Sequence, residues 1–379
     1  MSDLFNPSPE HRALRELVRS FTEREVDPQA EASDHEERFN VQLFRKLGEL
    51  GLLGITVEER FGGAGLDPVA ALIAHEELSA ADPGFALAYL AHSMLFANNL
   101  QINGSDEQRA KYLPDACTGA KVCGMCMSEP GAGTDVLGMQ TTAIRKGDVY
   151  VLNGAKMWIT NGSIADVAVV WAQTDEGILG FLVEKDMPGF DAPEIEHKFS
   201  LRASVTSSLF FDNVRVPAAS VLPGVVGLKG PLSCLTQARY GITWGAIGAA
   251  QACLREAIDY SNERELFGRP VSHTQTIQRR LADMSRRITT AQLLSLQLGR
   301  LKDAGAMQPG QVSMAKWNNV RMALDIARDA RDVLGGAGIS AEYCPIRHML
   351  NLESVITYEG TETIHELVVG KELTGVNAF

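Results

Sequence analysis

The hydrophobic pattern of this chain changes period twice, near residue 121 and near residue 231. Before residue 121, apolar residues recur at the spacing of one helix face, for example at Leu14, Leu17, Val18 and Phe21. Between the two changes, short β-branched and aromatic runs alternate with turn residues such as Asn153-Gly154. After residue 231 the helical spacing returns. Because one period cannot serve both kinds of element, the sequence predicts an α+β protein with a helical domain (1–121), a β domain (122–230) and a second helical domain (231–379).

Individual elements can be placed within this order. Ser8-Pro9 predicts the start of a helix and Pro28 predicts its end. Further helices are expected over residues 69–78 and 87–100, and strands over residues 149–152, 167–171, 179–183 and 208–216. A long helix is expected over residues 314–334, with Gly335 as its C-terminal signal.

Length, charge and composition exclude several classes of function. A chain of 379 residues, 45% hydrophobic and 22% charged, has the composition of a globular protein of two or three domains. Its formal net charge of −12 disfavours binding to nucleic acid and to anionic membranes. No apolar run reaches the ~18 residues of a membrane span, and no targeting peptide is visible at the N-terminus. We therefore expect a cytoplasmic protein with no nucleic-acid or membrane partner.

The segment Cys123-Gly124-Met125-Cys126 has the spacing of a redox or zinc pair. No second pair of this kind and no His-x₃-His motif completes a zinc site. The pair also lies within the apolar run 122–127, which is typical of a buried strand. We therefore expect two buried thiols and no metal site.

A glycine-rich segment, Gly336-Ala337-Gly338-Ile339-Ser340-Ala341, fits the dinucleotide-binding fingerprint G-x-G-x-x-A. That fingerprint requires a strand before it and a helix after it, whereas a long helix is expected before this segment. The alternative is a helix end whose small residues let another group approach the backbone closely. The sequence context favours this alternative.

Two polar motifs in the β domain are candidates for cofactor binding. Residues 127–135 (M-S-E-P-G-A-G-T-D) form a Gly-rich turn directly after an apolar strand. Backbone N–H groups in such a turn can bind an anion, and the alternative is a plain surface turn. Trp158 and Thr160 lie two residues apart in an expected strand, so both face the same side. There they can pack against and hydrogen-bond a flat ring, the alternative being a core tryptophan.

A carboxylate stands beside a glycine in Thr357-Tyr358-Glu359-Gly360-Thr361, after an apolar-rich helix. A glutamate in this position can lie in a cleft where backbone N–H groups also reach the substrate. Isolated glutamates are more often solvated. Glu359 is therefore a candidate general base that needs support from its surroundings.

In their order and spacing, these motifs resemble the acyl-CoA dehydrogenase family over nearly the whole chain. The motifs are those at 127–135 and 158–160, E-R-x-x-F-G at 263–268, L-G-G-x-G at 334–338 and Y-E-G-T at 358–361. Residues 198–204, 238–245, 296–303 and 346–353 are similar to the glutaryl-CoA dehydrogenase branch. The resemblance implies an N-terminal helical domain, a middle β-barrel or sandwich domain and a C-terminal four-helix bundle.

The resemblance also implies roles for single residues. Glu359 would be the catalytic base, and Arg239 would orient the cleft wall beside it. FAD would be bound by Met125, Met127, Ser128, Gly133, Thr134, Trp158, Ile159, Thr160, Phe267, Thr361 and Thr363. The FAD of a neighbouring subunit would be contacted by Arg264, Gln275, Asp332, Val333, Leu334, Gly335 and Gly336. The acyl-CoA would be contacted by Ala86, Leu87, Thr134, Leu232, Leu235, Arg239, Tyr358 and Gly360.

One segment departs from the glutaryl-CoA dehydrogenase branch. In that branch an Arg-Ser pair, following D-S-G-Y, holds the distal carboxylate of the substrate, and a Glu precedes it. Here residues 82–85 read D-P-G-F and are followed by Ala86 and Leu87, with Ser79 at the Glu position. A buried carboxylate without a cationic or donor partner is costly. We therefore expect the acyl end of the pocket to be apolar or small.

The expected reaction is FAD-dependent α,β-dehydrogenation of a short-chain acyl-CoA, in which Glu359 removes the α-proton and a hydride passes to flavin N5. The resemblance further implies a homotetramer and electron-transfer flavoprotein as the electron acceptor. The first alternative is oxidative decarboxylation of glutaryl-CoA to crotonyl-CoA. Others are an acyl-carrier-protein-linked dehydrogenase, a flavin oxidase or monooxygenase on the same fold, and a non-catalytic interaction protein.

Overall fold

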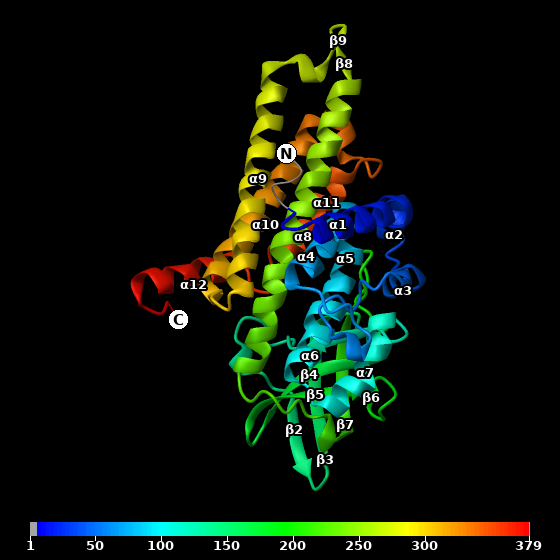
Figure 1. Ribbon diagram of the computed structural model, residues 1–379, viewed down its shortest axis with the longest axis vertical. Coiled ribbons are helices and arrows are strands. Elements are labelled where there is room, and N and C mark those ends of the chain that lie inside the picture. Colours follow the sequence, from blue (N-terminus) through cyan, green and yellow to red (C-terminus); the bar gives the residue numbers. More distant parts are fainter. Residues whose placement is uncertain (1–5, 379) are drawn as a thin grey trace.

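The computed structural model describes residues 6–378 and has the expected order of helices, strands and helices (Figure 1). Residues 1–5, on which the expected lack of a targeting peptide rests, lie outside the described residues. The N-terminal helices are α1 (Pro9–Phe21), α2 (Asp27–His35), α3 (Val41–Glu49), α4 (Pro68–Ala81), α5 (Pro83–Tyr89), α6 (Asn98–Asn103) and α7 (Asp106–Thr118). The middle strands are β1 (Cys123–Cys126), β2 (Thr142–Lys146), β3 (Val149–Thr160), β4 (Val167–Thr174), β5 (Gly177–Glu184), β6 (Phe190–Asp191) and β7 (Thr206–Pro217). The C-terminal elements are α8 (Lys229–Glu263), β8 (Glu265–Leu266), β9 (Arg269–Pro270), α9 (Gln275–Asp303), α10 (Pro309–Val333), α11 (Cys344–Val355) and α12 (Glu362–Thr374).

The first helix begins where the sequence predicts but does not end there. The Ser8 side chain caps α1 by accepting a hydrogen bond from the His11 N–H at 3.3 Å. Pro28 was expected to end this element, and that prediction is wrong. The chain instead continues through a π-helical segment, Thr22–Val26, into α2, where Pro28 lies in the first turn. Proline is tolerated there because the N–H that it lacks has no partner within the helix.

The expected β domain is one mixed sheet of seven strands in the order β1-β4-β2-β3-β7-β6, with β5 paired to β4. The expected strands fall within β3, β4, β5 and β7. β1 pairs with β4 in parallel, while β3 and β7 form a long antiparallel pair. The register of that pair shifts between Lys156 and Ile159. This bulge lies at Trp158, whose φ is +63°.

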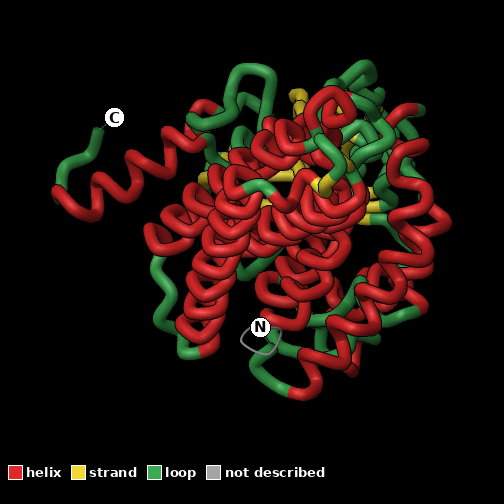
Figure 2. The backbone as a smooth tube through the Cα atoms, turned by 90° about the horizontal axis from the view of Figure 1, so that it is seen from above, coloured by secondary structure: helices red, strands yellow, loops and turns green. Residues whose placement is uncertain are grey.

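In the C-terminal domain, α8, α9, α10 and α11 pack against one another as a four-helix bundle (Figure 1). α12 follows and projects away from the bundle, as Figure 2 shows at the C-terminal end. α10 ends at Val333, and Gly335 follows with a φ of +60°, which confirms its predicted role as the C-terminal signal. No helix within residues 6–378 is long and apolar enough to cross a bilayer.

The β domain is tied to both helical domains close to the candidate site. The Asn161 side chain, just after β3, donates hydrogen bonds of 3.1 Å to the carbonyls of Ala88 on α5 and Cys123 on β1. On the other side, Asn351 of α11 accepts a 2.7 Å hydrogen bond from the Leu201 N–H. The Asn161 bonds thus hold the end of β3 to β1 and α5, and the Asn351 bond holds the loop before β7 to α11, the helix that leads into the turn of the candidate base.

Close packing of α8 on α4 depends on Gly248. A Cβ at this position would lie 2.0 Å from the Glu76 carbonyl oxygen, whereas a Cβ at Gly370 of α12 would meet nothing within 4 Å. We expect Gly248→Ala to destabilise the fold by about 1–3 kcal/mol through overpacking. Gly370→Ala, the matched control, should be neutral or stabilise by up to about 1 kcal/mol because alanine favours helix. Thermal unfolding of both variants checks this, and equal midpoints would contradict the packing argument.

Candidate active site

Glu359 lies in the turn between α11 and α12, in a backbone conformation that is rare for glutamate. Its φ is +56° and that of Gly360 is +97°. A non-glycine residue in this left-handed region costs about 1–3 kcal/mol, so the surrounding structure must hold it. Gly360 cannot easily be replaced, because a Cβ there would lie 2.9 Å from His365 Cε1. The glycine beside the candidate base is therefore required by the turn.

A half-buried arginine and a buried lysine, from two helices, hold the carbonyls of this turn. Arg239 of α8 donates from Nε to the Glu359 carbonyl at 2.7 Å. Lys316 of α10 donates from Nζ to the Gly360 carbonyl at 2.7 Å and also to the Tyr358 carbonyl. Three consecutive carbonyls, those of Tyr358, Glu359 and Gly360, thus each accept a hydrogen bond from a cation. This arrangement supports the expected position of Arg239 beside the base.

The Glu359 side chain is half-buried, with one carboxylate oxygen inside the protein. Its Oε2 atom is buried and has no hydrogen-bond partner among the described residues. Burial raises the pKa of Glu359 to about 7, while the charges of Arg239 and Lys316 oppose the rise. A carboxyl with a pKa near 7 and a free oxygen can accept a proton at neutral pH.

Lys316 was missed in the sequence, although a signal for it was available. It lies on the apolar face of the predicted helix, four residues before Val320 and eleven before Ala327, both fully buried. Its own side chain is 1% exposed. A lysine within an apolar stripe breaks the helical pattern, and buried charges need partners. The sequence thus indicates that Lys316 is a buried cation that needs partners.

The Gly-rich turn after β1 is held by a second buried lysine. Lys156 of β3 donates to Glu129 Oε1 at 2.8 Å and to the Met127 carbonyl at 3.0 Å. Glu129 also accepts from the N–H groups of Gln140 and Thr141. Burial opposes ionisation of Glu129, but these hydrogen bonds outweigh it and lower the pKa of the carboxyl. These hydrogen bonds hold the buried part of the turn rigidly, while the tip of the turn is exposed.

The exposed side of this turn can accommodate a flat cofactor. Gly133 and Thr134 are exposed, and a Cβ built on Gly133 would meet nothing within 4 Å. Trp158 is 58% exposed, whereas Ile159 is buried and Thr160 half-buried. Trp158 is therefore not a core tryptophan, and its indole is free to pack against a ligand. Met125 is buried in β1, while Met127 and Ser128 are half-buried where the turn begins.

Several residues expected at a flavin lie far from this turn in the same chain. Arg264 ends α8 and Phe267 lies in the β8–β9 hairpin that follows, at the opposite end of the molecule from the β sheet of the middle domain (Figure 1). Phe267 is fully exposed. Gln275 and Asp332 lie near this end, because Arg280 of α9 forms a 2.6 Å ion pair with Asp332. Val333 and Leu334 are buried, whereas Gly335 and Gly336 are exposed. One chain does not bring these residues to the Gly-rich turn.

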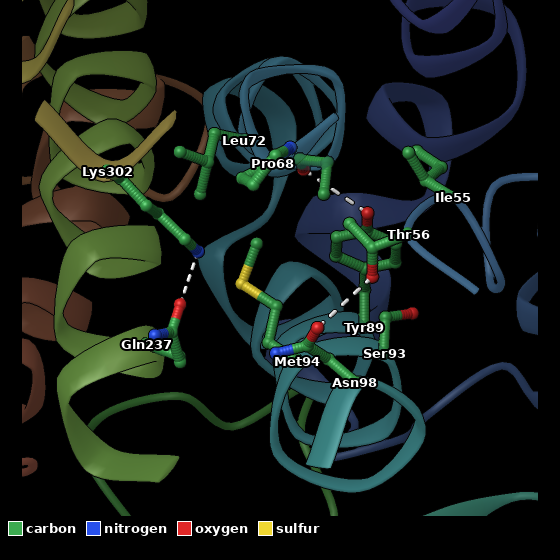
Figure 3. Close-up of a pocket in the computed structure, with 11 residues that line it drawn as sticks. Ile55, Thr56, Pro68, Leu72, Tyr89, Ser93, Met94, Asn98, Gln237 and Lys302 are labelled. Carbon is green, nitrogen blue, oxygen red and sulfur yellow. Dashed lines mark hydrogen bonds between the residues drawn. The ribbon is translucent and has the colours of Figure 1, made fainter. Parts of the chain in front are cut away.

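The expected acyl-contacting residues differ in exposure. Ala86 and Leu87 on α5 and Leu235 on α8 are buried, while Leu232 is exposed and Tyr358 is half-buried. Figure 3 shows a pocket between the N-terminal helices, α8 and the end of α9. Tyr89, Met94, Gln237 and Lys302 are among its lining residues. The Lys302 ammonium contacts the Gln237 side chain, and burial lowers the pKa of Lys302 to about 8.

A second pocket adjoins the candidate base on its C-terminal side. It is lined by Thr361 and Thr363 together with Arg321 and Arg328 of α10. Both guanidinium groups are ion-paired with carboxylates that also line the pocket, Arg321 with Glu362 and Arg328 with Glu353. This pocket gives Thr361 and Thr363 a polar setting.

Two other sequence patterns are resolved by the structure. The thiols of Cys123 and Cys126 are buried in β1, as expected, and burial raises the pKa of both. Within residues 6–378, no cluster of three or more His, Cys, Asp or Glu side chains could hold a metal. The segment 336–341 follows a helix and begins in a 3₁₀ turn, Gly335–Ile339, so the Rossmann interpretation is excluded.

Family models match three successive parts of the chain. They describe the N-terminal, middle and C-terminal domains of acyl-CoA dehydrogenase and match residues 8–120, 124–214 and 226–374. A short-chain-specific acyl-CoA dehydrogenase of Clostridium acetobutylicum is 35% identical, over 97% of this chain and 99% of the relative.

Solved structures give the same result at higher identity. A glutaryl-CoA dehydrogenase from Mycobacterium smegmatis is 48% identical with a TM-score of 0.95, covering 98% of this chain and 96% of that one. A glutaryl-CoA dehydrogenase from the same organism, in complex with FADH2, is 45% identical with a TM-score of 0.97, covering 100% and 98%. With all three domains matched in order and full-length relatives above 30% identity, this chain belongs to the acyl-CoA dehydrogenase family.

Proposed function

We propose that this enzyme removes the α-proton of a short-chain acyl-CoA with Glu359 and dehydrogenates the Cα–Cβ bond. The observation that carries the proposal is the Glu359 carboxylate, whose Oε2 atom is buried without a hydrogen-bond partner and whose pKa is raised to about 7. A base must be ionised at working pH yet strong enough to take a weakly acidic proton. Among the predicted site residues, Glu359 has this combination.

The proposal includes FAD as the resident cofactor. The exposed Trp158 beside Thr160 and the open Gly-rich turn fit a flat ring and its phosphates, and one similar structure contains FADH2. Met125, Met127, Ser128, Gly133, Thr134, Trp158, Ile159 and Thr160 would hold the cofactor, with Thr361 and Thr363 closing over it. When bound, FAD accepts the β-hydrogen as a hydride at flavin N5.

Residues of the chain prepare the proton transfer. The hydrogen bonds from Arg239 and Lys316 fix the Glu359 backbone, so that the carboxylate reaches the α-carbon without reorganisation. The Glu359 N–H is proposed to donate to the thioester oxygen, where negative charge develops as the α-proton leaves. Bound substrate excludes water and keeps the carboxylate desolvated. Leu232, Leu235, Thr134, Tyr358 and Gly360 are proposed to surround the acyl-CoA.

We favour an apolar acyl end because Ala86 and Leu87 are buried and supply neither a cation nor a polar donor from their side chains.

One observation favours the glutaryl-CoA alternative. Lys302 lines a pocket with Tyr89 and Met94, which follow Ala86 and Leu87 along the same helical stretch. Its ammonium contacts the neutral Gln237 side chain. If the substrate carries a distal carboxylate, Lys302 is the proposed partner.

We further propose a homotetramer that passes electrons to electron-transfer flavoprotein. The exposed Phe267 and Arg264 lie too far from the Gly-rich turn of their own chain to share its cofactor (Figure 1). These two residues, together with the exposed Gln275, Asp332, Gly335 and Gly336, are proposed to reach the cofactor of a neighbouring subunit. Val333 and Leu334 belong to the same segment, but their side chains are buried.

Replacing the base gives the first test of this function. Glu359→Gln should retain FAD and bind acyl-CoA, because the amide has the same shape and the hydrogen bonds to the backbone carbonyls of the turn are unchanged. Flavin reduction should fall by several orders of magnitude, because the amide cannot take the proton. Anaerobic stopped-flow bleaching of the flavin measures this. Reduction at the wild-type rate would show that another group is the base.

The pH dependence of kcat/KM reports the same carboxyl in the free enzyme. Its pKa is raised above the ordinary value by burial, so the ionised base is depleted below neutrality. We expect kcat/KM for butyryl-CoA to rise with pH through a midpoint of about 7 and to fall about tenfold per unit below it. A profile that is flat between pH 5 and 8 would rule out a base with this pKa.

Butyryl-CoA and glutaryl-CoA distinguish the two substrates. With an apolar acyl end, anaerobic bleaching by butyryl-CoA should be much faster than by glutaryl-CoA, and Lys302→Met should change neither rate greatly. Preferential bleaching by glutaryl-CoA that is lost in Lys302→Met would establish the alternative. Rapid oxygen consumption with either substrate would instead favour an oxidase.

A further inference from the structure

Three consecutive carbonyls of the Glu359 turn accept hydrogen bonds from two cations, one from Arg239 and two from Lys316. Arg239 holds the carbonyl of Glu359 itself. Lys316 holds the carbonyls on both sides of it, those of Tyr358 and Gly360. The strained residue is thus bracketed by the two hydrogen bonds of one ammonium group. An ammonium group carries three donors, so one lysine can hold both carbonyls at once.

The same two cations leave the carboxylate unbonded. No described residue forms a hydrogen bond with Glu359 Oε2. Within residues 6–378, the hydrogen bonds of Arg239 and Lys316 at this turn go to backbone carbonyls and not to the Glu359 carboxylate. Each cation therefore acts on the carboxylate through its charge while its hydrogen bonds hold the backbone. A direct ion pair would stabilise the ionised form strongly and weaken the base.

We propose that Lys316 is a positioning residue for the catalytic base, holding the strained Glu359 turn by its flanking carbonyls and keeping the buried carboxyl ionisable by its charge. The inference rests on the proposed role of Glu359 and deepens it. It assigns no contact between Lys316 and substrate or cofactor. We therefore expect the positive charge at position 316, and not only its hydrogen bonds, to set the pKa of Glu359.

The charged and titratable groups that face this centre come from three helices and from the turn itself. They are Arg239 and Cys234 on α8, Lys316 on α10, Tyr358 in the turn and His365 on α12. Burial raises the pKa of Cys234 to about 12 and that of Tyr358 beyond it, so both stay neutral. Burial lowers the pKa of His365 to about 3, so it too is neutral. Arg239 stays charged.

Among the described groups that face Glu359, Lys316 is the one whose charge can change near neutrality. Burial lowers the pKa of Lys316 to about 7, which the Glu359 charge opposes and the Arg239 charge reinforces. Acceptance of its hydrogen bonds by two carbonyls favours the ammonium form. The pH dependence of the enzyme near neutrality therefore reports the Glu359–Lys316 pair and not either residue alone.

Lys316→Met tests the inference, because methionine keeps the length of the side chain and removes both its charge and its donors. Loss of a positive neighbour should raise the midpoint of the kcat/KM profile by about one pH unit. The rate of flavin reduction below pH 7 should fall at least tenfold, with the KM for butyryl-CoA changed less than kcat. Lys198→Met is the matched control. Lys198 also holds a carbonyl, that of Ser204 at 2.7 Å, but it does so in the β domain. The kcat/KM profile of Lys198→Met should therefore keep the wild-type midpoint.

A second variant separates charge from hydrogen bonding and protects against misfolding. Lys316→Gln keeps N–H donors without the charge, so it should shift the midpoint as Lys316→Met does while losing less rate. FAD content and circular dichroism establish that each variant is folded. A folded, FAD-loaded Lys316→Met or Lys316→Gln enzyme with the wild-type midpoint would overturn the inference, even if its rate were lower at every pH.

Parallel measurements on Glu359→Gln keep the two proposals apart. If Glu359→Gln reduces its flavin at the wild-type rate, the assigned base is wrong and the role of Lys316 falls with it. If Glu359→Gln is inactive but the Lys316 variants keep the wild-type midpoint, only the positioning role falls.

Discussion

Burial of a carboxylate without a hydrogen-bond partner is the constraint on which the rest of this site depends. Isolated from water, the Glu359 carboxyl would stay protonated and useless as a base. Two cations placed on the backbone, not on the carboxylate, limit that effect. The consequence is a pKa near 7, between a solvated glutamate and a fully desolvated one. The positive φ of Glu359 is the strain that accompanies this arrangement.

The two halves of the site use a buried lysine in opposite ways. Lys156 pairs directly with Glu129, and that carboxyl is held ionised as a structural group below the Gly-rich turn. Lys316 is bonded to carbonyls and leaves its carboxyl neighbour free. Ion pairing thus makes a rigid support in one place, and its absence leaves a reactive group in the other. Both lysines are essentially inaccessible to water, so each needs all the partners that it has.

Much of this organisation can be predicted from the sequence, because periodicity and turn residues are local. The change of period predicts the three-part order, and Gly335 predicts the end of α10. Pro28 shows the limit of such rules, because proline fits the first turn of a new helix as well as it ends an old one. The bulge at Trp158 and the positive φ of Glu359 depend on pairing and tertiary contacts, which no local pattern encodes. A local signal marks Lys316, as a lysine within the apolar face of α10, but its partners lie more than forty residues away, so no local pattern predicts what it holds.

Removal of the substrate α-proton by Glu359 is the step on which the proposed function depends, and the α-deuterium isotope effect tests it most directly. The measurement compares anaerobic flavin bleaching of the FAD-loaded enzyme by butyryl-CoA and by its α-deuterated form, at saturating substrate and at pH 7. We expect the deuterated substrate to reduce the flavin severalfold more slowly, because the transferred α-hydrogen is in motion in the transition state. Equal rates with the two substrates would contradict it.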